Sequence, residues 1–144
     1  MNVLVTGGSR GLGFEFVNVF VETGNAVATI VRSESAKRTV EKHYPKCTVL
    51  VADITNFSEL DELDYLKNNS IDVLINNAGK ASFGTSITDS EPDEIERQFK
   101  IHCLGAFNVT KAAYSALAKA EDPFTNNQIE NGGYYCVETG TMQW

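Results

Sequence analysis

Positive charge and long hydrophobic runs are both scarce in this sequence. Twelve Lys and Arg residues stand against 19 Asp and Glu residues, so the formal net charge is −7 and the sequence pI is about 4.8. An acidic balance of this kind argues against nucleic-acid backbones and anionic membranes as partners. No apolar run approaches the roughly 20 residues that a membrane-spanning helix needs. We therefore expect neither nucleic acid nor a membrane as a partner.

Cysteine and histidine are too few to suggest a metal site. The three cysteines, Cys47, Cys103 and Cys136, lack the paired spacing of metal-binding motifs, and two histidines add no ligand cluster. Reduced thiols in a cytosolic protein are the simplest interpretation of an odd cysteine number. The first apolar run begins at residue 2, which leaves no room for a signal peptide. We expect a cytoplasmic protein without a bound metal.

The apolar residues that are present suffice for a buried core. Hydrophobic residues make up 42% of the 144 positions and charged residues 22%, a balance typical of globular proteins and not of disordered ones. Internal repeats and low-complexity linkers are absent, and a chain of this length usually forms one domain. We therefore expect residues 1–144 to form a single domain.

Short apolar runs alternate with segments of helical periodicity. The expected strands are Asn2–Val5, Ala26–Val31, Thr48–Val51, Asp72–Asn76 and Tyr134–Val137. Helical patterns cover residues 11–23, 33–44, 58–68 and, with a bend near Gly105, 94–120. Such alternation is typical of βαβ units. It predicts an α/β fold with a doubly wound, Rossmann-like parallel sheet in the strand order 3-2-1-4-5.

Two of the expected helices begin with capping signals. Ser58 and Asp61 have the spacing of a capping box. Ser90 stands just before a helical pattern that carries Pro92 in its first turn. We therefore predict that Ser58 and Ser90 are the N-caps of their helices.

A glycine-rich stretch, residues 6–13, joins the first expected strand to the first helix. Gly7 allows a sharp turn, Gly11 allows a diphosphate to approach the backbone, and Gly13 allows the helix to pack closely. The free amide groups and positive dipole end of that helix would face the phosphates. A plain strand-to-helix turn with incidental glycines is the alternative for this stretch alone. The predicted dinucleotide contacts here are Gly7, Ser9, Arg10, Gly11, Leu12 and Gly13.

Two further motifs follow later strands. Asp53 and Ile54 come after the third expected strand, and Asn76-Asn77-Ala78-Gly79 follows the fourth. Together with the glycine stretch, they resemble the short-chain dehydrogenase/reductase family, over roughly residues 1–120. The resemblance implies an NAD(P)-dependent oxidoreductase that transfers hydride to or from a carbonyl or alcohol. It also implies that Asp53 contacts the adenine edge, that Ile54 is a further cofactor-binding residue, and that Asn77, Ala78 and Gly79 lie beside the cofactor.

Cofactor preference can be predicted from the end of the second expected strand. An NAD-preferring site usually carries an acidic residue about 20 positions after the glycines. Val31 occupies that place here, and it is followed by Arg32 and Ser33, while Arg10 lies within the glycine stretch. Two guanidinium groups suit a 2′-phosphate, so the pattern favours NADP(H) over NAD(H). Ordinary solvated surface arginines are the alternative.

The catalytic residues of the family are matched less well. His102 stands in the long helix where the family carries an asparagine, although a histidine with a purely local partner is an equal alternative. Thr139 and Thr141 follow the fifth expected strand, where the family has its active-site serine. The sequence contains no Tyr-x-x-x-Lys, which supplies the acid/base pair of the family. His102, Thr139 and Thr141 are therefore the catalytic candidates.

Three hypotheses remain open at this point. The first is an NADP(H)-dependent carbonyl or alcohol oxidoreductase, truncated after about five strands. The second is a non-catalytic dinucleotide-binding or interaction module, and the third is an inactive truncated product. Apolar surface on the long helix predicts a homo-oligomer. The residues expected in that surface are Ile101, Leu104, Phe107, Val109, Ala112 and Leu117, and the strand Tyr134–Val137 is expected to add an unpaired edge.

Overall fold

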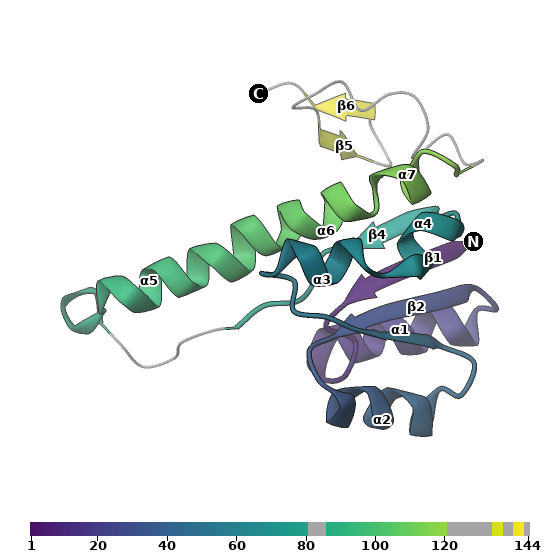
Figure 1. Ribbon diagram of the computed structural model, residues 1–144, viewed down its shortest axis with the longest axis horizontal. Helices are drawn as coiled ribbons and strands as arrows, with labels where there is room; N and C mark the ends of the chain where they lie inside the picture. The colour runs from purple at the N-terminus through teal and green to yellow at the C-terminus, as the bar shows by residue number, and fades with distance from the viewer. Residues whose placement is uncertain (81–85, 121–133, 137–139, 143–144) are drawn as a thin grey trace.

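Four parallel strands form the central sheet of the computed structural model, which describes residues 1–80, 86–120, 134–136 and 140–142 (Figure 1). The order of the sheet is β3-β2-β1-β4. Its strands are β1 (Asn2–Thr6), β2 (Ala26–Val31), β3 (Thr48–Val51) and β4 (Val73–Ile75). All three pairings are parallel, with Leu4 of β1 opposite both Ala28 and Leu74. The α/β class and the predicted order of the first four strands are confirmed.

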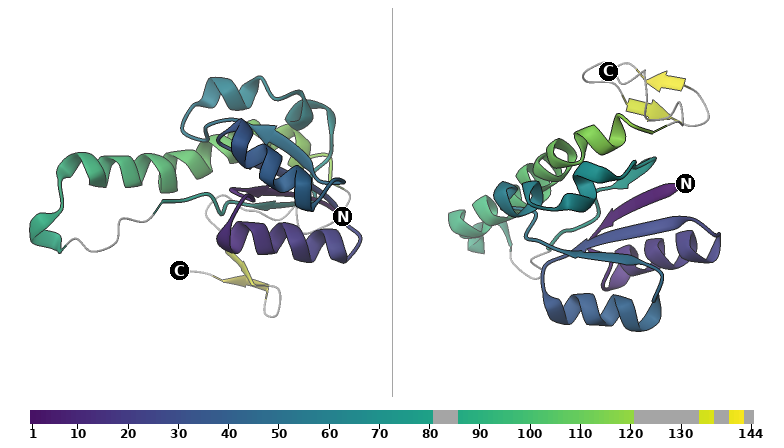
Figure 2. Two further views of the ribbon diagram at one scale, coloured as in Figure 1. Left: turned by 90° about the horizontal axis from the view of Figure 1, so that it is seen from below. Right: turned by 45° about the vertical axis from the view of Figure 1, so that its right-hand side comes forward.

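Helices cover both faces of this sheet (Figure 2). One face carries α1 (Gly11–Glu22) and α2 (Glu34–His43), which pack through Val17 and Val40. The opposite face carries α3 (Phe57–Asp61), α4 (Asp64–Asn68), α6 (Ala106–Ala112) and α7 (Tyr114–Leu117). The sheet is therefore the middle layer of three.

The central strands are apolar without alternation because each face of the sheet has its own core. Leu4, Ala28 and Ile30 belong to the core beneath α3, α4, α6 and α7. Val3, Val5, Val27 and Val31 belong to the core beneath α1 and α2. Burial of each such Val, Leu or Ile side chain contributes about 1.5–3 kcal/mol. Continuous apolar strands are thus the expected consequence of a sheet covered on both sides.

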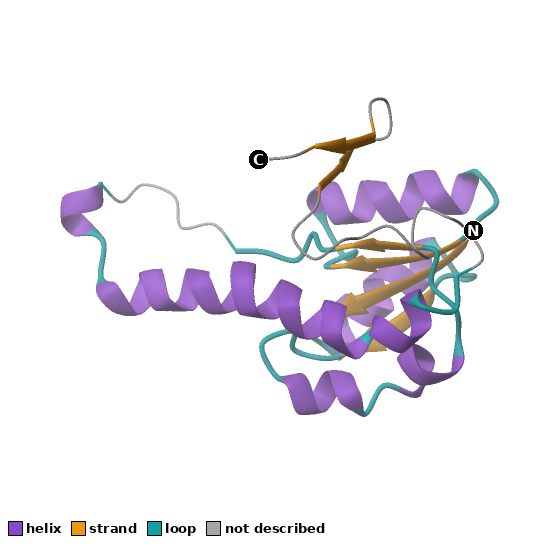
Figure 3. Ribbon diagram, turned by 90° about the horizontal axis from the view of Figure 1, so that it is seen from above, coloured by secondary structure: helices purple, strands orange, loops and turns teal. Residues whose placement is uncertain are grey.

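One long helical run leaves the sheet and extends well beyond the strands (Figure 3). It follows the 3-10 turn η1 (Ile87–Asp89) and consists of α5 (Pro92–Phe99), the π-helical segment η2 (Lys100–Gly105) and α6. The place where a bend is predicted, near Gly105, is a π-helical segment that ends at this glycine. A Cβ on Gly105 would lie 2.7 Å from Cδ1 of Ile54, so the helix passes close to the loop after β3. No helix among the described residues is long and apolar enough to cross a membrane.

Both predicted N-caps are wrong. The cap of α3 is Asn56, which accepts from the Ser58 amide (3.2 Å) and donates to Oε1 of Glu59 (2.8 Å). Asn56 and Glu59 have the spacing of a capping box two positions earlier than predicted, but Glu59 accepts from the Asn56 side chain, while the Asn56 backbone amide donates to the Asp53 carbonyl. Helix α5 begins at Pro92 after Glu91, and its predicted cap, Ser90, donates instead to the Ser86 carbonyl (2.9 Å).

The prediction of a fifth parallel strand is also wrong. Strand β5 (Tyr134–Cys136) pairs antiparallel with β6 (Gly140–Met142) in a separate two-stranded sheet. Only three residues separate these strands, and so short a connection permits a hairpin but no crossover to a parallel neighbour. Val137, the last residue of the expected strand, lies outside the described residues.

Candidate functional site

The glycine stretch leaves β1 in a conformation that requires glycine. Gly7 has φ +78° and Gly11 has φ +56°, both in the left-handed region that strains other residues. The Gly7 amide donates to the Ile30 carbonyl of β2 (2.8 Å). The turn therefore folds back onto the neighbouring strand before α1 begins.

Gly8 is tied to the same strand by a side chain that sequence reasoning missed. Its amide donates to Oγ1 of Thr29 (3.1 Å), and the Thr29 hydroxyl donates to the Val5 carbonyl (2.8 Å). A Cβ on Gly8 would lie 2.4 Å from this hydroxyl oxygen, so glycine is needed here for close approach. The signal in the sequence is Thr29 itself, the one polar residue within Ala26–Val31.

Gly13 brings the first turn of α1 against the two motifs at the ends of β1 and β4. A Cβ on Gly13 would lie 2.4 Å from the Gly7 carbonyl oxygen and 2.4 Å from Nδ2 of Asn77. That Asn77 amide donates to the Thr6 carbonyl (2.9 Å). The close packing predicted for Gly13 is thus contact with the backbone of its own turn and with Asn77.

Thr6 joins the ends of β1 and β4. Its Oγ1 accepts from the amides of Asn77 (3.0 Å) and Ala78 (3.0 Å), and donates to the Ile75 carbonyl (3.4 Å). Asn77 therefore braces the two strand ends through both its backbone and its side chain. The glycine stretch and the segment 76–79 meet at one edge of the sheet, where open α/β folds bind ligands.

The N-terminus of α1 is open and free of negative charge. Its N-cap, Arg10, has an extended backbone and makes no side-chain cap hydrogen bond, and the first turn holds no acidic residue. Arg10, Gly11 and Leu12 are exposed, while Ser9 is half-buried. A Cβ placed on Gly11 would meet nothing within 4 Å. These features fit an anionic group such as a diphosphate, because helix amides and dipole there favour negative charge.

Arg32 lies one residue beyond β2 and is exposed, as is Arg10. None of the ion pairs found among the described residues includes either arginine. Ser33 is the N-cap of α2 and accepts from the Ala36 amide (3.3 Å). Helix α2 thus has a side-chain cap that was not predicted from the sequence, and two guanidinium groups remain available for an anionic ligand.

Asp53 and Ile54 lie in the loop after β3. One carboxylate oxygen of Asp53 accepts from the Thr55 amide (2.8 Å) and hydroxyl (2.7 Å), which closes a local turn. The Ile54 carbonyl accepts from Nδ2 of Asn108 on α6 (3.1 Å). These bonds fix the loop at the same sheet edge, and the adenine contact of Asp53 stays a prediction.

His102 lies against Gly79, at the end of the segment after β4. A Cβ on Gly79 would lie 2.6 Å from Cε1 of His102. Nε2 of His102 faces two acceptors, the Lys80 carbonyl (2.9 Å) and Oε1 of Gln98 (3.0 Å). Because neither acceptor can donate, Nε2 carries a proton.

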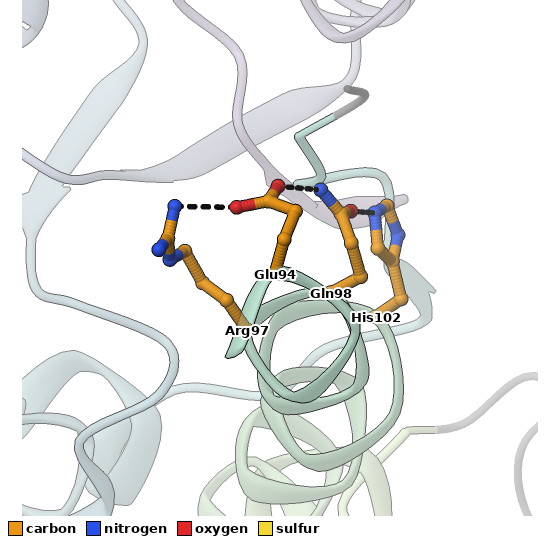
Figure 4. Close-up of polar contacts among 4 residues, drawn as sticks. All are labelled: Glu94, Arg97, Gln98 and His102. Atoms are coloured by element: carbon orange, nitrogen blue, oxygen red, sulfur yellow. Dashed lines mark hydrogen bonds and ion pairs between the residues drawn. The ribbon is translucent and has the colours of Figure 1, made fainter. Parts of the chain in front are cut away.

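A network of side chains continues from His102 along the helix (Figure 4). Gln98 donates through Nε2 to Oε1 of Glu94 (2.7 Å), and Glu94 forms an ion pair with Arg97. The structure thus places His102 beside the predicted cofactor residue Gly79. Of the other catalytic candidates, Thr139 lies outside the described residues, and Thr141 belongs to β6 of the separate two-stranded sheet. The catalytic roles of all three residues remain predictions.

Two dehydrogenases are similar to this chain in sequence. L-fucose dehydrogenase of Bos taurus is 28% identical over 127 residues, which cover 86% of this chain and 47% of that protein. A 3alpha-hydroxysteroid dehydrogenase of Mediterraneibacter gnavus is 29% identical over 148 residues, covering 96% of this chain and 54% of the relative. The chain thus spans about half the length of these curated relatives.

Solved structures share the fold. A short-chain dehydrogenase from Streptomyces avermitilis superposes with a TM-score of 0.72 and 28% identity, covering 81% of this chain and 44% of that one. An NADPH-bound carbonyl reductase from chicken fatty liver gives a TM-score of 0.71 at 23% identity, over 83% and 52% of the two chains. A family model described as short chain dehydrogenase matches residues 1–122. The chain therefore belongs to the short-chain dehydrogenase family.

Proposed function

We propose that the chain binds NADP(H) at the turn between β1 and α1 and serves hydride transfer between this cofactor and a carbonyl or alcohol. One observation carries the proposal: the uncapped N-terminus of α1 opens beside a glycine turn, with Arg10 exposed at the turn itself. A helix end of this kind favours phosphate, and the family to which the chain belongs acts by oxidoreduction. The cofactor, when bound, supplies or accepts the hydride.

Different segments of the chain would bind different parts of the cofactor along the edge of the sheet. The start of α1, from Ser9 to Gly13, would receive the diphosphate, and Asp53 with Ile54 would receive the adenine. Asn77, Ala78 and Gly79 would lie beside the opposite end of the cofactor. The bonds from Thr6 and Asn77 support this assignment, because they hold two of these segments together in advance of binding.

The preference for NADP(H) rests on charge at the end of β2. Val31 is buried and offers no carboxylate to a ribose 2′-hydroxyl. Arg10 and Arg32 are exposed and enter none of the ion pairs among the described residues. Guanidinium groups bind phosphate by charge-assisted hydrogen bonds, so a 2′-phosphate would gain what a hydroxyl would not.

We also propose that His102 takes part in proton transfer. Thr139 or Thr141 would supply the hydroxyl group that the active-site serine supplies in the family. The contact of His102 with Gly79 supports a place for the ring beside the cofactor. In the neutral ring the proton is on Nε2, so Nδ1 holds the lone pair and can accept a proton. We further propose that residues 1–144 act as one domain in the cytoplasm.

The long helix supplies the proposed contact with a second copy. Leu104 and Phe107 are 43% and 62% exposed, and Phe99 is similarly uncovered at 55%. The expected surface is smaller than predicted, because Val109 is buried and Ala112 and Leu117 pack against the core beneath α6. An exposed apolar strip on one helix favours association, so we propose a homo-oligomer.

Titration of the chain with NADPH and NADH tests the cofactor assignment. We expect NADPH to bind more tightly, and the double change Arg10→Ala with Arg32→Ala to remove most of the difference. Each charge-assisted contact is worth about 1.5–3 kcal/mol. Arg38→Ala is the matched control, because Arg38 is an exposed arginine of α2 outside the proposed site. Equal affinities for the two cofactors in the unmodified chain would contradict the preference, and no binding of either would contradict the proposed function.

A further inference from the structure

Thr29 is a polar side chain in the middle of an apolar face. Among the residues that the structure describes, Thr6 and Thr29 are the two polar side chains that are buried, and Thr29 is 0% exposed. Val27 and Val31, two positions away on either side, share its face of β2 and belong to the core beneath α1 and α2. Valine has nearly the same shape as threonine and is the residue at the two neighbouring positions of this face. The hydroxyl group is therefore the feature that needs an explanation.

Hydrogen-bond directions around this hydroxyl follow from its partners. The Val5 carbonyl can only accept, so the single hydroxyl proton of Thr29 points to it (2.8 Å). The Gly8 amide can only donate, so it uses a lone pair of the same oxygen (3.1 Å). Thr29 therefore bridges the end of β1 to the second residue of the glycine stretch, and both of its hydrogen-bonding roles are satisfied.

This bridge determines the direction of the peptide groups in the turn. The Gly7 amide is directed to the Ile30 carbonyl and the Gly8 amide to Thr29, so both face β2. The chain is then free to start α1 at Gly11, where the helix bond from the Phe14 amide to the Arg10 carbonyl forms. The amides at the start of α1 are thus left for a ligand, while the first two amides of the turn are held by the sheet.

We propose that Thr29 is a positioning residue for the cofactor, which holds the Gly7–Gly8 backbone in the conformation that presents the start of α1 to phosphate. The inference rests on the proposed dinucleotide site, but adds to it a buried residue that touches no cofactor. Removal of the hydroxyl would leave the Gly8 amide and the Val5 carbonyl without their partner in a dry core. The turn would then relax toward conformations that satisfy Gly8 elsewhere, and the phosphate site would lose its preformed shape.

Three variants separate this role from general stability. Thr29→Val removes the hydroxyl at constant shape, Thr29→Ser keeps the hydroxyl, and Val27→Ala removes methyl groups from the same face. We expect Thr29→Val to weaken NADPH binding about tenfold, the loss of about one buried hydrogen bond. Thr29→Ser should stay within about threefold of the unmodified chain, since only a methyl group is lost. Val27→Ala should lower the unfolding temperature without changing the dissociation constant of the folded protein.

A second measurement does not depend on the cofactor. Hydrogen exchange of the Gly8 amide, followed by NMR in the cofactor-free chain, should be slow in the unmodified protein and in Thr29→Ser. It should accelerate at least about tenfold in Thr29→Val, while Val27→Ala leaves it slow relative to its neighbours. Should Thr29→Val fail to fold, Thr29→Ala replaces it, because it also removes the hydroxyl and adds no bulk.

The outcomes are distinguishable. Unchanged NADPH binding and unchanged Gly8 exchange in the hydroxyl-free variant would overturn the role of Thr29. Equal weakening of NADPH binding by Thr29→Val and Val27→Ala would reduce Thr29 to an ordinary core residue. If the unmodified chain does not bind NADPH, the proposed function fails, yet Gly8 exchange still decides whether Thr29 holds the turn.

Discussion

Polar contacts at the end of β1 are buried, whereas those along the helical run from α5 into η2 lie at the surface. Thr6 and Thr29 are 1% and 0% exposed, and each hydroxyl bridges backbone groups of two segments. The network from Arg97 to His102 joins side chains on one helix, and its two ends are exposed (Figure 4). Loss of a buried partner costs about 1–3 kcal/mol, but an exposed ion pair contributes only about 0–1 kcal/mol.

This difference in burial indicates which half of the site has its shape before a ligand binds. The glycine turn is fixed by hydrogen bonds that water cannot replace, so its shape is part of the stability of the sheet. The His102 side is held by contacts that water and salt can weaken. We therefore expect the cofactor end of the site to exist before binding, and the His102 end to adjust more readily.

We expect the largest loss of stability from Gly13→Ala, and Gly11→Ala is the variant with which it is compared. A methyl group on Gly13 would press on the Gly7 carbonyl and the Asn77 amide, so we expect a loss of about 3 kcal/mol in the free energy of unfolding. A methyl group on Gly11 meets no protein atom and should cost only about 1–2 kcal/mol for its left-handed backbone. Urea unfolding measures both changes.

NADPH titration completes this comparison. Gly11→Ala should weaken binding more than its stability loss explains, because its methyl group projects into the open space beside the start of α1. Equal stability losses in the two variants would show that the turn is not fixed as described. Unchanged NADPH affinity in Gly11→Ala would place the phosphate elsewhere.

Thr6→Val should have the next largest effect. The change removes the acceptor of the Asn77 and Ala78 amides, and we expect a loss of about 1–3 kcal/mol in the free energy of unfolding. Thr6→Ser is the control, because it retains the hydroxyl group. Urea unfolding of the three proteins decides the matter; a Thr6→Ser variant as unstable as Thr6→Val would assign the loss to packing instead.

Much of the sheet could be predicted from the sequence because its strands are short, apolar and separated by helical patterns. The glycine stretch and Asn77 could be placed at one edge for the same reason, since parallel strands end together. The pairing of the fifth expected strand could not be predicted, because its residues suit a parallel strand and an antiparallel strand equally. Only the short connection to β6 determines that the two strands form a hairpin. Thr29 was missed because a buried threonine and a buried valine look alike in a strand pattern.

Self-association should respond to the exposed strip of the long helix. Leu104→Glu with Phe107→Glu places charges on two exposed apolar positions, so we expect dissociation to monomers at micromolar concentration. Sedimentation velocity measures the change, and Val19→Glu, at an exposed position of α1, is the control. A monomer in the unmodified chain would contradict the proposed homo-oligomer, and association that survives the double change would place the contact elsewhere.

The smallest effect should come from Arg97→Ala, at the exposed end of the His102 network. Its ion pair with Glu94 has side chains 53% and 24% exposed, so we expect a loss below about 0.5 kcal/mol, or about 1–2 °C in unfolding temperature. Because surface charge is screened by salt, even this small difference should shrink at high ionic strength. Lys37→Ala, which removes the partly exposed Lys37–Glu41 pair of α2, gives the matched value for an ion pair away from the site. A loss as large as that of Thr6→Val would show that the helix network is as firmly built as the end of β1, and the contrast between the two regions would not hold.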